Sequence, residues 1–402
     1  MQPEPQTPPP VLAAPPLAAS SPHQWLAILL TICLGLFLLD AFTSLLDDSL
    51  GLFLSLHFLA GIRFLTGLFA LMILILVFVL MAFVPAIPKR YFLPLTLFPP
   101  AALLASIPFL TFFFRQQQLI AWCISLCQVV VGLCVLCHFQ GGLRFRWPMV
   151  PVNHLPIRRF RWRHFGAFVL GALVVLPLVS GVYLFACSCL AVSHLSEGFM
   201  ALRPGGLSVQ VRTYTRADGK EIHLFPMAHV ADAAFYQKVS LSFPTNSIIL
   251  MEGVTDDQNL ITNKISYKRM ASKLGLAEQH EKFIPAQGTV VPADVDVSIF
   301  SKDTIDLLNL AMYFHSHGIN AQNIQMLLQA PLSPRLEDEL LDDLVRKRNQ
   351  HLIEQVQLYL PKSDEIMIPW GAAHMPDLAH QIQKSGFHLV KSENYQVIRF
   401  HF

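Results

Sequence analysis

Three polar side chains that could perform chemistry each follow a short apolar segment in the second half of the chain. They are His229, Glu252 and His374, and the segments before them are residues 222–225, 247–251 and 366–370. Buried strands of α/β folds commonly deliver polar groups where their carboxyl ends open into loops, so we expect the three to share a site. Two imidazoles and a carboxylate suit a divalent metal ion or acid–base catalysis. From the residues alone, a hydrogen-bonded structural role stays open for each.

Further charged side chains are weaker candidates. Asp294 and Asp296 alternate in Ala-Asp-Val-Asp-Val, so a strand would point both carboxylates to one face. They could supply a carboxylate to the site, but a solvated strand edge is the interpretation that we favour. Arg348 lies beside Arg346 and Lys347, and this cluster by itself indicates a solvated helix face.

Helical segments alternate with the apolar segments along the second half. The predicted helices are residues 230–241, 303–317, 333–359 and 378–385. Ser333 and Pro334 form an N-cap and first-turn pair at the start of the third helix. This order of elements predicts an α/β fold.

Charge is distributed unequally between the two halves of the chain. Hydrophobic residues make up 53% and charged residues 14%, whereas soluble domains average about 25% charged. Residues 1–205 hold 11 Lys+Arg and 5 Asp+Glu, and residues 206–402 hold 18 and 22. The composition excludes a disordered chain and a disulfide-stapled mini-protein, and a net charge of +2 gives no reason to expect a nucleic-acid partner.

The first half is predicted to be a membrane module of about five α-helices, residues 23–200, in contact with the lipid bilayer. Its apolar segments are residues 25–46, 62–84, 92–114, 119–139 and 165–192. Each reaches the roughly 20 residues that a spanning helix needs. Residues 49–60 are too short to span, and we expect them to lie in the interface or to extend the second helix. Residues 1–22 are rich in Pro and Ala and are predicted to be a disordered leader.

Basic residues predict the orientation of this module. They follow the second segment and separate the fourth from the fifth, whereas Asp47 and Asp48 are expected in the loop after the first. Both basic loops then face the cytoplasm, and residues 206–402 are extracytoplasmic. Asp40 and Arg63 are expected near the ends of their spans, which favours an anchor over a transporter. All seven cysteines lie in the first half, so no disulfide is expected in residues 206–402.

Four short motifs in the second half resemble those of the TraB/GumN/TIKI family. The first is Leu-Phe-Pro-Met-Ala-His-Val at residues 224–230, which contains His229, and the second is Leu-Met-Glu-Gly at residues 250–253, which contains Glu252. The third is Arg348-Asn349, and the fourth is Pro-Trp-Gly-Ala-Ala-His-Met-Pro at residues 369–376, which contains His374. The family pattern is two Gly-x-x-His motifs with a Glu between them. The resemblance extends over most of residues 206–402 and none of the membrane module.

The resemblance implies an α/β fold shared distantly with erythromycin esterases and ChaN-like proteins. It also implies metallohydrolase activity, with His229, Glu252 and His374 holding a divalent metal ion, and it raises Arg348 to a site residue that binds a carboxylate or carbonyl. The first motif departs from the pattern, because Pro226 stands where Gly is expected. Proline fixes φ and has no N–H, so this difference bears directly on activity.

The sequence therefore predicts a membrane-anchored, metal-dependent hydrolase that cleaves an amide or ester of a peptide or small molecule outside the cytoplasm. The resemblance and the layout together suggest a multi-pass protein of the bacterial inner (plasma) membrane. Without a metal, one histidine would act as general base, as the erythromycin esterases imply. The alternative is a non-catalytic domain that binds a peptide or signal at the membrane surface, which Pro226 favours; a transport or assembly component is a third possibility.

Overall fold

The computed structural model describes residues 21–56, 58–156, 159–262, 267–317 and 336–400. The chain divides into two compact units, Met1–Cys187 and Ser188–Phe402, and each is described by itself. Nearly all of the predicted leader lies outside the described residues, and so does the predicted helix start at Ser333 and Pro334.

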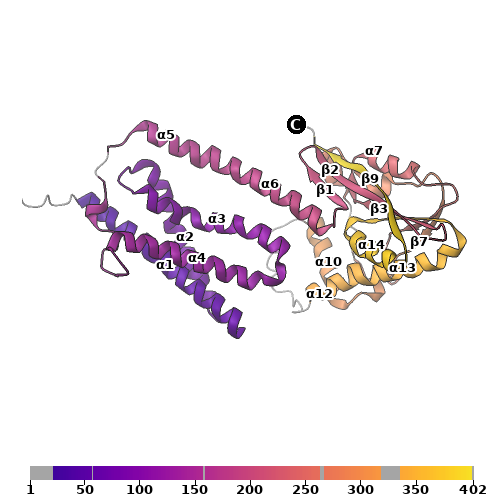
Figure 1. Ribbon diagram of the computed structural model, residues 1–402, viewed down its shortest axis with the longest axis horizontal. Coiled ribbons are helices and arrows are strands. Elements are labelled where there is room, and N and C mark those ends of the chain that lie inside the picture. The colour runs from indigo at the N-terminus through magenta and orange to yellow at the C-terminus, as the bar shows by residue number, and fades with distance from the viewer. Residues whose placement is uncertain (1–20, 57, 157–158, 263–266, 318–335, 401–402) are drawn as a thin grey trace, which may run out of the picture. The chain divides into compact units, whose positions relative to one another are not determined.

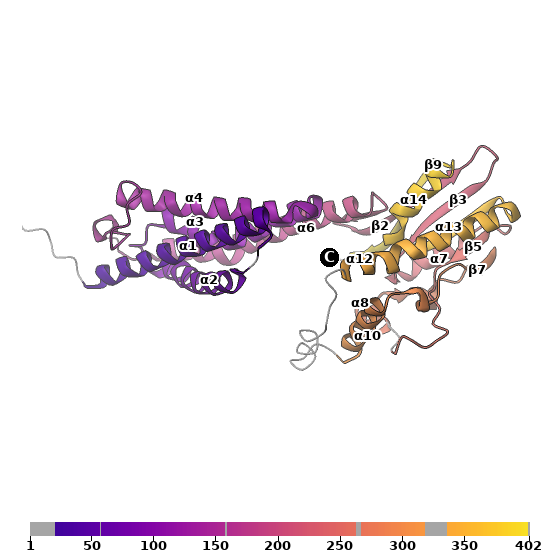
Figure 2. The same cartoon turned by 90° about the horizontal axis from the view of Figure 1, so that it is seen from below.

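The first unit is built from long apolar helices (Figures 1 and 2). They are α1 (Ser21–Leu54), α2 (Ala60–Phe83), α3 (Lys89–Phe112), α4 (Gln117–Gln140) and a last helix formed by α5 (Trp162–Leu170), the π turn η3 (Gly171–Val175) and α6 (Leu176–Leu195), which continues into the second unit. Short 3-10 turns lie at η1 (Phe114–Gln116) and η2 (Val152–His154). Within the described residues, five helices are thus long and apolar enough to cross a membrane, as predicted.

The first helix is longer than expected, and it places charged residues inside the helical unit. Residues 49–54 extend α1, not α2, and the prediction that Asp47 and Asp48 lie in a loop is wrong. Both are buried, and Nη1 of Arg63 lies 3.3 Å from Asp47 and 2.5 Å from Asp48. The apolar run after Asp48 contains no proline, and the ion pairs give the carboxylates internal partners, so α1 continues through them.

Asp40 also lies within α1 and not near its end, contrary to expectation. Its Oδ2 accepts a hydrogen bond of 2.8 Å from Nε2 of Gln128, which lies in the middle of α4. The helical unit therefore holds polar contacts between its helices in addition to its apolar core.

The second unit contains a mixed seven-stranded sheet. Its strands are β1 (Met200–Arg203), β2 (Gly206–Thr215), β3 (Glu221–Met227), β5 (Ile248–Met251), β7 (Thr289–Pro292), β8 (Glu365–Gly371) and β9 (His388–Arg399). The order is β1-β2-β3-β8-β5-β7, and β9 pairs with β2. Strands β3, β8, β5 and β7 are parallel to one another, whereas β2 is antiparallel to β1, β3 and β9.

Helices cover both faces of this sheet (Figures 1 and 2). On one face, α13 (Lys347–Tyr359) and α14 (Met375–Lys384) pack against a buried cluster that includes Ile366, Ile368 and Trp370 of β8. On the other face, α7 (Ala233–Leu241) packs against a cluster that includes Met367. Alternate residues of a strand point to opposite faces, so the nearly continuous apolar run in β8 reflects burial on both sides. The α/β layering expected for this half is present.

The remaining elements of the second unit are short or flank the sheet. They are β4 (Val230–Ala231), α8 (Lys268–Leu274), β6 (Ala277–Glu278), α9 (Gln279–Lys282), η4 (Val297–Ile299), α10 (Lys302–His317), α12 (Leu336–Leu341), the π turn η5 (Asp342–Arg346), η6 (Leu360–Lys362) and η7 (Ala372–His374). Strands β4 and β6 pair as a separate two-stranded sheet. Two residues of the expected helix at 230–241 are thus a strand, and the helix begins at Ala233.

Pro226 lies in β3 at a position that tolerates proline. The pairing of β3 with β2 ends at Leu224, whereas the pairing with β8 continues to Met227. Pro226 therefore has a strand neighbour on one side only, and the missing N–H costs no ladder hydrogen bond to β2.

Candidate active site

The four parallel strands deliver polar side chains at one edge of the sheet. His229 follows β3, Glu252 follows β5, Asp294 follows β7, and His374 follows β8. Carboxyl ends of parallel strands form the usual ligand-binding edge of such sheets. The structure thus brings the three residues expected from the sequence to one edge and adds Asp294.

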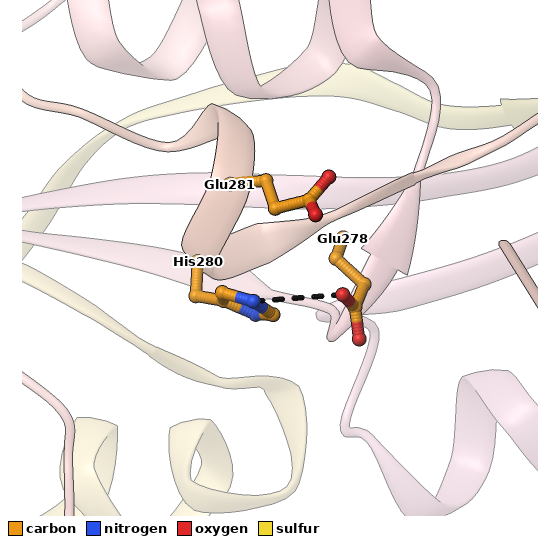
Figure 3. Close-up of side chains that lie close together, drawn as sticks. All are labelled: Glu278, His280 and Glu281. Atoms are coloured by element: carbon orange, nitrogen blue, oxygen red, sulfur yellow. Dashed lines mark ion pairs between the residues drawn. The ribbon is translucent and has the colours of Figure 1, made fainter. Parts of the chain in front are cut away.

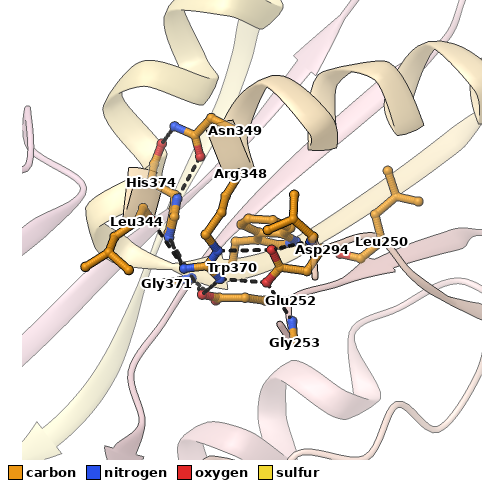
Figure 4. A network of polar contacts seen from close by, with 11 residues as sticks. Leu250, Glu252, Gly253, Asp294, Leu344, Arg348, Asn349, Trp370, Gly371 and His374 are labelled. Carbon is orange, nitrogen blue, oxygen red and sulfur yellow. Dashed lines mark hydrogen bonds and ion pairs between the residues drawn. The ribbon is translucent and has the colours of Figure 1, made fainter. Parts of the chain in front are cut away.

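Arg348 joins two of these carboxylates (Figure 4). Its Nε and Nη2 donate to Asp294 at 3.0 and 2.6 Å, and Nη2 also donates to Oε1 of Glu252 at 2.8 Å. The side chains of Arg348, Asp294 and Glu252 are 12%, 0% and 14% exposed. Burial alone would lower the pKa of Arg348, but the two carboxylates outweigh it and hold that pKa above its ordinary value.

The remaining N–H groups of Arg348 are also used within the protein. Nη1 donates to the carbonyl of Leu344 at 3.3 Å and lies 3.2 Å from Nε2 of His374. Leu344 belongs to the π turn η5, which ends at Arg346, one residue before α13 begins at Lys347. A guanidinium has five N–H donors, and all five now have acceptors. Arg348 therefore has none left for a substrate carboxylate or carbonyl, and it acts as a positioning residue.

His374 is buried behind a fixed hydrogen-bond pattern. Its side chain is 5% exposed, and its Nδ1 lies 2.7 Å from Oδ1 of Asn349. An amide oxygen only accepts, so Nδ1 carries the proton and Nε2 accepts from Arg348. Burial lowers the pKa of His374, which keeps the ring neutral at pH 7. Its ring packs edge-on against Trp370 at 5.2 Å between centroids.

Glu252 is the carboxylate that faces open space. Its Oε2 accepts from the main-chain N–H of Gly371 at 2.5 Å, and its Oε1 accepts from Arg348. It also lines a cavity of about 600 Å³. The other lining residues are His229, Met251, Gly253, Val254, Tyr267, Gln279, His280, Phe283 and Arg348. Each carboxylate oxygen keeps a second lone pair, so Glu252 can accept a proton or a hydrogen bond from a molecule in this cavity.

His229 lines the same cavity from the end of β3. Its ring stacks on Tyr267 with centroids 5.3 Å apart and planes within 7°. Its main-chain carbonyl accepts from the N–H of Gln279 at 2.9 Å, which holds the turn after β3 against α9. Of the three residues expected as metal ligands, Glu252 and His229 line the cavity, together with Arg348, whereas His374 is not among its lining residues.

The expected metal ligands are not gathered around one point. Ligand atoms of His229, Glu252 and His374 do not all lie within 4.8 Å of one another. The guanidinium of Arg348 instead contacts both Glu252 and His374, and a second cation beside it would be repelled. The three side chains as arranged therefore do not fit a divalent ion.

One other group of metal-type side chains occurs within the described residues. Glu278, His280 and Glu281 have ligand atoms within 4.8 Å of one another (Figure 3). Nε2 of His280 lies 3.5 Å from Glu278, and Nζ of Lys268 lies 3.1 Å from Glu281. Lys268 thus already supplies a positive charge to this group.

The sequence did not predict the roles of two residues in this network. Asp294 was expected at a solvated edge, but its side chain is completely buried against Arg348, and Asp296 instead accepts from the N–H of Ser298 at the start of η4. Asn349 orients His374, a role that was not predicted although the residue stands beside Arg348 in one of the motifs quoted above.

No family model, no curated protein and no solved structure matches this chain.

Proposed function

We propose that the α/β unit is a hydrolase that cleaves an ester or amide bond without a metal ion. The observation that carries this proposal is the cavity of about 600 Å³ on which Glu252 and His229 open from two different strands. Substrates of this class need a base for the attacking water and an acid for the leaving group.

Glu252 is the proposed general base. The group of Glu252, Asp294 and Arg348 has two carboxylates and one guanidinium, so it carries one net negative charge and can take up one proton. Glu252 removes a proton from water, and the oxygen of that water attacks the carbonyl carbon. Collapse of the tetrahedral intermediate breaks the bond to the leaving oxygen or nitrogen, which takes a proton from His229.

Arg348 and His374 are assigned supporting roles. Arg348 fixes the carboxylate of Glu252 through a hydrogen bond and holds Asp294 beside it. His374, oriented by Asn349, fixes Nη1 of Arg348. A base held in one orientation avoids the cost of reorganisation during the reaction.

The second candidate is a non-catalytic domain that binds a peptide or signal. The observation that favours it is the complete internal pairing of Arg348 and of both ring nitrogens of His374, which leaves few groups for chemistry. In this case Glu252 and His229 would bind polar groups of the ligand without turnover.

We also propose that the five apolar helices anchor this unit in a bacterial inner membrane, with residues 206–402 outside the cytoplasm. The support is the number of helices that could span and the basic residues between them. Cysteine labelling of a position in residues 206–402 from either side of the membrane tests the orientation.

The two functions are separated by assaying the full chain in nanodiscs against a panel of esters and peptides. Turnover that falls at least about 100-fold in Glu252→Gln supports the hydrolase. Binding of the same panel without turnover, weakened by Glu252→Gln, supports the binding domain instead.

A further inference from the structure

The first unit contains a cavity surrounded by positive charge. It has a volume of about 630 Å³ and lies where α2 ends, α3 begins and the chain enters α5. Its basic lining residues are Lys89, Arg90, Arg159, Arg161 and His164. Among the described residues that line it, none is acidic. Two segments about 70 residues apart in the sequence thus contribute cations to one hollow.

These cations lack acidic partners. Over the described residues, no Asp or Glu lies within ion-pair distance of Lys89, Arg90, Arg159 or Arg161. The carboxylates described in this unit belong to Asp40, Asp47 and Asp48, and the last two pair with Arg63. Arg63 is 18 residues before the lining residue Met81 on α2, which is about 27 Å along a helix. At that distance Asp47 and Asp48, which already pair with Arg63, form no ion pair with the cations of the cavity.

Helix ends add to the positive potential. Lys89 and Arg90 are the first two residues of α3, which has 24 residues, and Arg161 is the N-cap of α5. The first N–H groups of a helix have no intrahelical acceptors, and the helix dipole places partial positive charge there. Two helix N-termini thus border a cavity that already holds four side-chain cations.

The rest of the lining is apolar. Met81, Ile87, Phe160 and Phe165 are part of the wall, and Nζ of Lys89 lies 4.6 Å from the centroid of the Phe168 ring. A ligand that matches both features carries a compact anionic group and an attached apolar portion. Phosphate suits the cationic part, because guanidinium groups bind its oxygens in pairs.

We propose that this cavity binds a phosphate group, and that the group is the headgroup of an anionic phospholipid. The apolar wall and the position at the ends of helices long enough to span a membrane favour the lipid over free phosphate. Basic cavities between membrane helices are a recurrent form of headgroup site. The site is independent of the proposed hydrolase, because every residue that lines it belongs to the first unit.

The test uses the full chain in neutral detergent and counts retained lipids by native mass spectrometry while phosphatidylglycerol is titrated. The variant Arg159→Gln/Arg161→Gln removes two cations from the cavity. The control Arg144→Gln/Arg146→Gln removes two cations from the same connection between α4 and α5, at positions that do not line the cavity. We expect about 30-fold weaker binding in the first variant, which corresponds to about 2 kcal/mol, and less than about threefold in the control.

Equal losses of lipid affinity in both double variants would show diffuse attraction to a basic loop and would overturn the proposal. An unchanged affinity in both would overturn it as well. If Arg159→Gln/Arg161→Gln fails to fold, Lys89→Gln/Arg90→Gln removes two cations from the opposite wall and is held to the same expectation. Phosphatidylcholine is expected to bind far more weakly than phosphatidylglycerol.

A second arm separates the two sources of phosphate. Inorganic phosphate is compared with chloride at matched ionic strength as a competitor for phosphatidylglycerol. Retention of the lipid supports a headgroup site. If phosphate displaces the lipid from the wild type but not from Arg159→Gln/Arg161→Gln, the cavity is a phosphate site whose occupant is a free anion, and the assignment to a lipid headgroup is overturned.

Discussion

Replacing Arg348 by methionine removes the cation that the site carboxylates share. Asp294 is then left fully buried with a negative charge, and within the described residues its remaining hydrogen bonds come from the main-chain N–H groups of Gly253 and Val295. Glu252 loses its hydrogen bond to the guanidinium, and Nε2 of His374 loses its partner. Methionine fills a similar volume, so the change reports chiefly on charge and hydrogen bonding rather than on a cavity.

Breaking a buried ion pair by removing one partner costs about 3–5 kcal/mol. Arg348 makes its two bonds to Asp294 where that carboxylate is 0% exposed, so we expect a loss within this range. This is a large part of the roughly 5–15 kcal/mol by which domains are stable. On an Asp294→Asn background the same substitution no longer strands a buried charge, and its cost is expected to fall by at least about 1 kcal/mol.

Trp370 provides the signal for this measurement, because it is buried beside Arg348 and is the only tryptophan in residues 188–402. The other four tryptophans are replaced by Phe, and unfolding of the full chain in detergent is followed by fluorescence in urea. Arg348→Lys is the control that keeps the charge, and it should cost less than Arg348→Met. A loss below about 1 kcal/mol for Arg348→Met, or equal costs with and without Asp294→Asn, would refute the reasoning.

Three further predictions concern stability. Burial lowers the pKa of His374 in the folded state, so the unfolded state binds more protons in acid. The free energy of unfolding should therefore be highest above the unfolded pKa of about 6.5, and at lower pH it should decrease by at most about 1.4 kcal/mol per pH unit. Unfolding midpoints between pH 7.5 and 5.5 measure this, and an unchanged slope in His374→Gln would contradict it. Gly206→Ala should cost more than about 2 kcal/mol, because its φ is +133° and a Cβ would lie 2.0 Å from the carbonyl oxygen of Ile398. Gly205→Ala meets no atom within 4 Å and serves as the control; equal urea midpoints for the two would count against this account. Gly371→Ala should cost less than about 1 kcal/mol, because its φ is −51° and its Cβ would make an ordinary 3.4 Å contact with Glu252; a larger shift in the urea midpoint would show that the motif glycine is required.

Much of the layout follows from patterns with a simple physical period. Apolar segments of about 20 residues correspond to the five long helices. Short apolar runs before His229, Glu252 and His374 correspond to β3, β5 and β8, because a strand buried on both faces is apolar throughout. β8 lies between β3 and β5 and is parallel to both, which is why the residues after these strands lie at one edge of the sheet.

Other features depend on tertiary partners that no local pattern reveals. Asp47 and Asp48 lie within a helix because Arg63 is near them in space, and helix length was therefore underestimated. The alternation of Asp294 and Asp296 indicated a solvated strand edge, yet Asp294 is buried because Arg348 of α13 neutralises it. The charged cluster of Arg346, Lys347 and Arg348 did not by itself show which member would point inward, and only the resemblance singled out Arg348.

The proposed hydrolysis depends most directly on Glu252 at the cavity. The decisive measurement is hydrolysis of an ester and peptide panel by the full chain in nanodiscs, with and without a chelator, for wild type, Glu252→Gln and His229→Gln. Glu281→Gln is the control, because it removes a nearby carboxylate that does not line the cavity. We predict turnover that the chelator leaves unchanged, that Glu281→Gln retains, and that falls by at least about 100-fold in Glu252→Gln. Turnover that survives in Glu252→Gln, or that the chelator abolishes, would contradict the account.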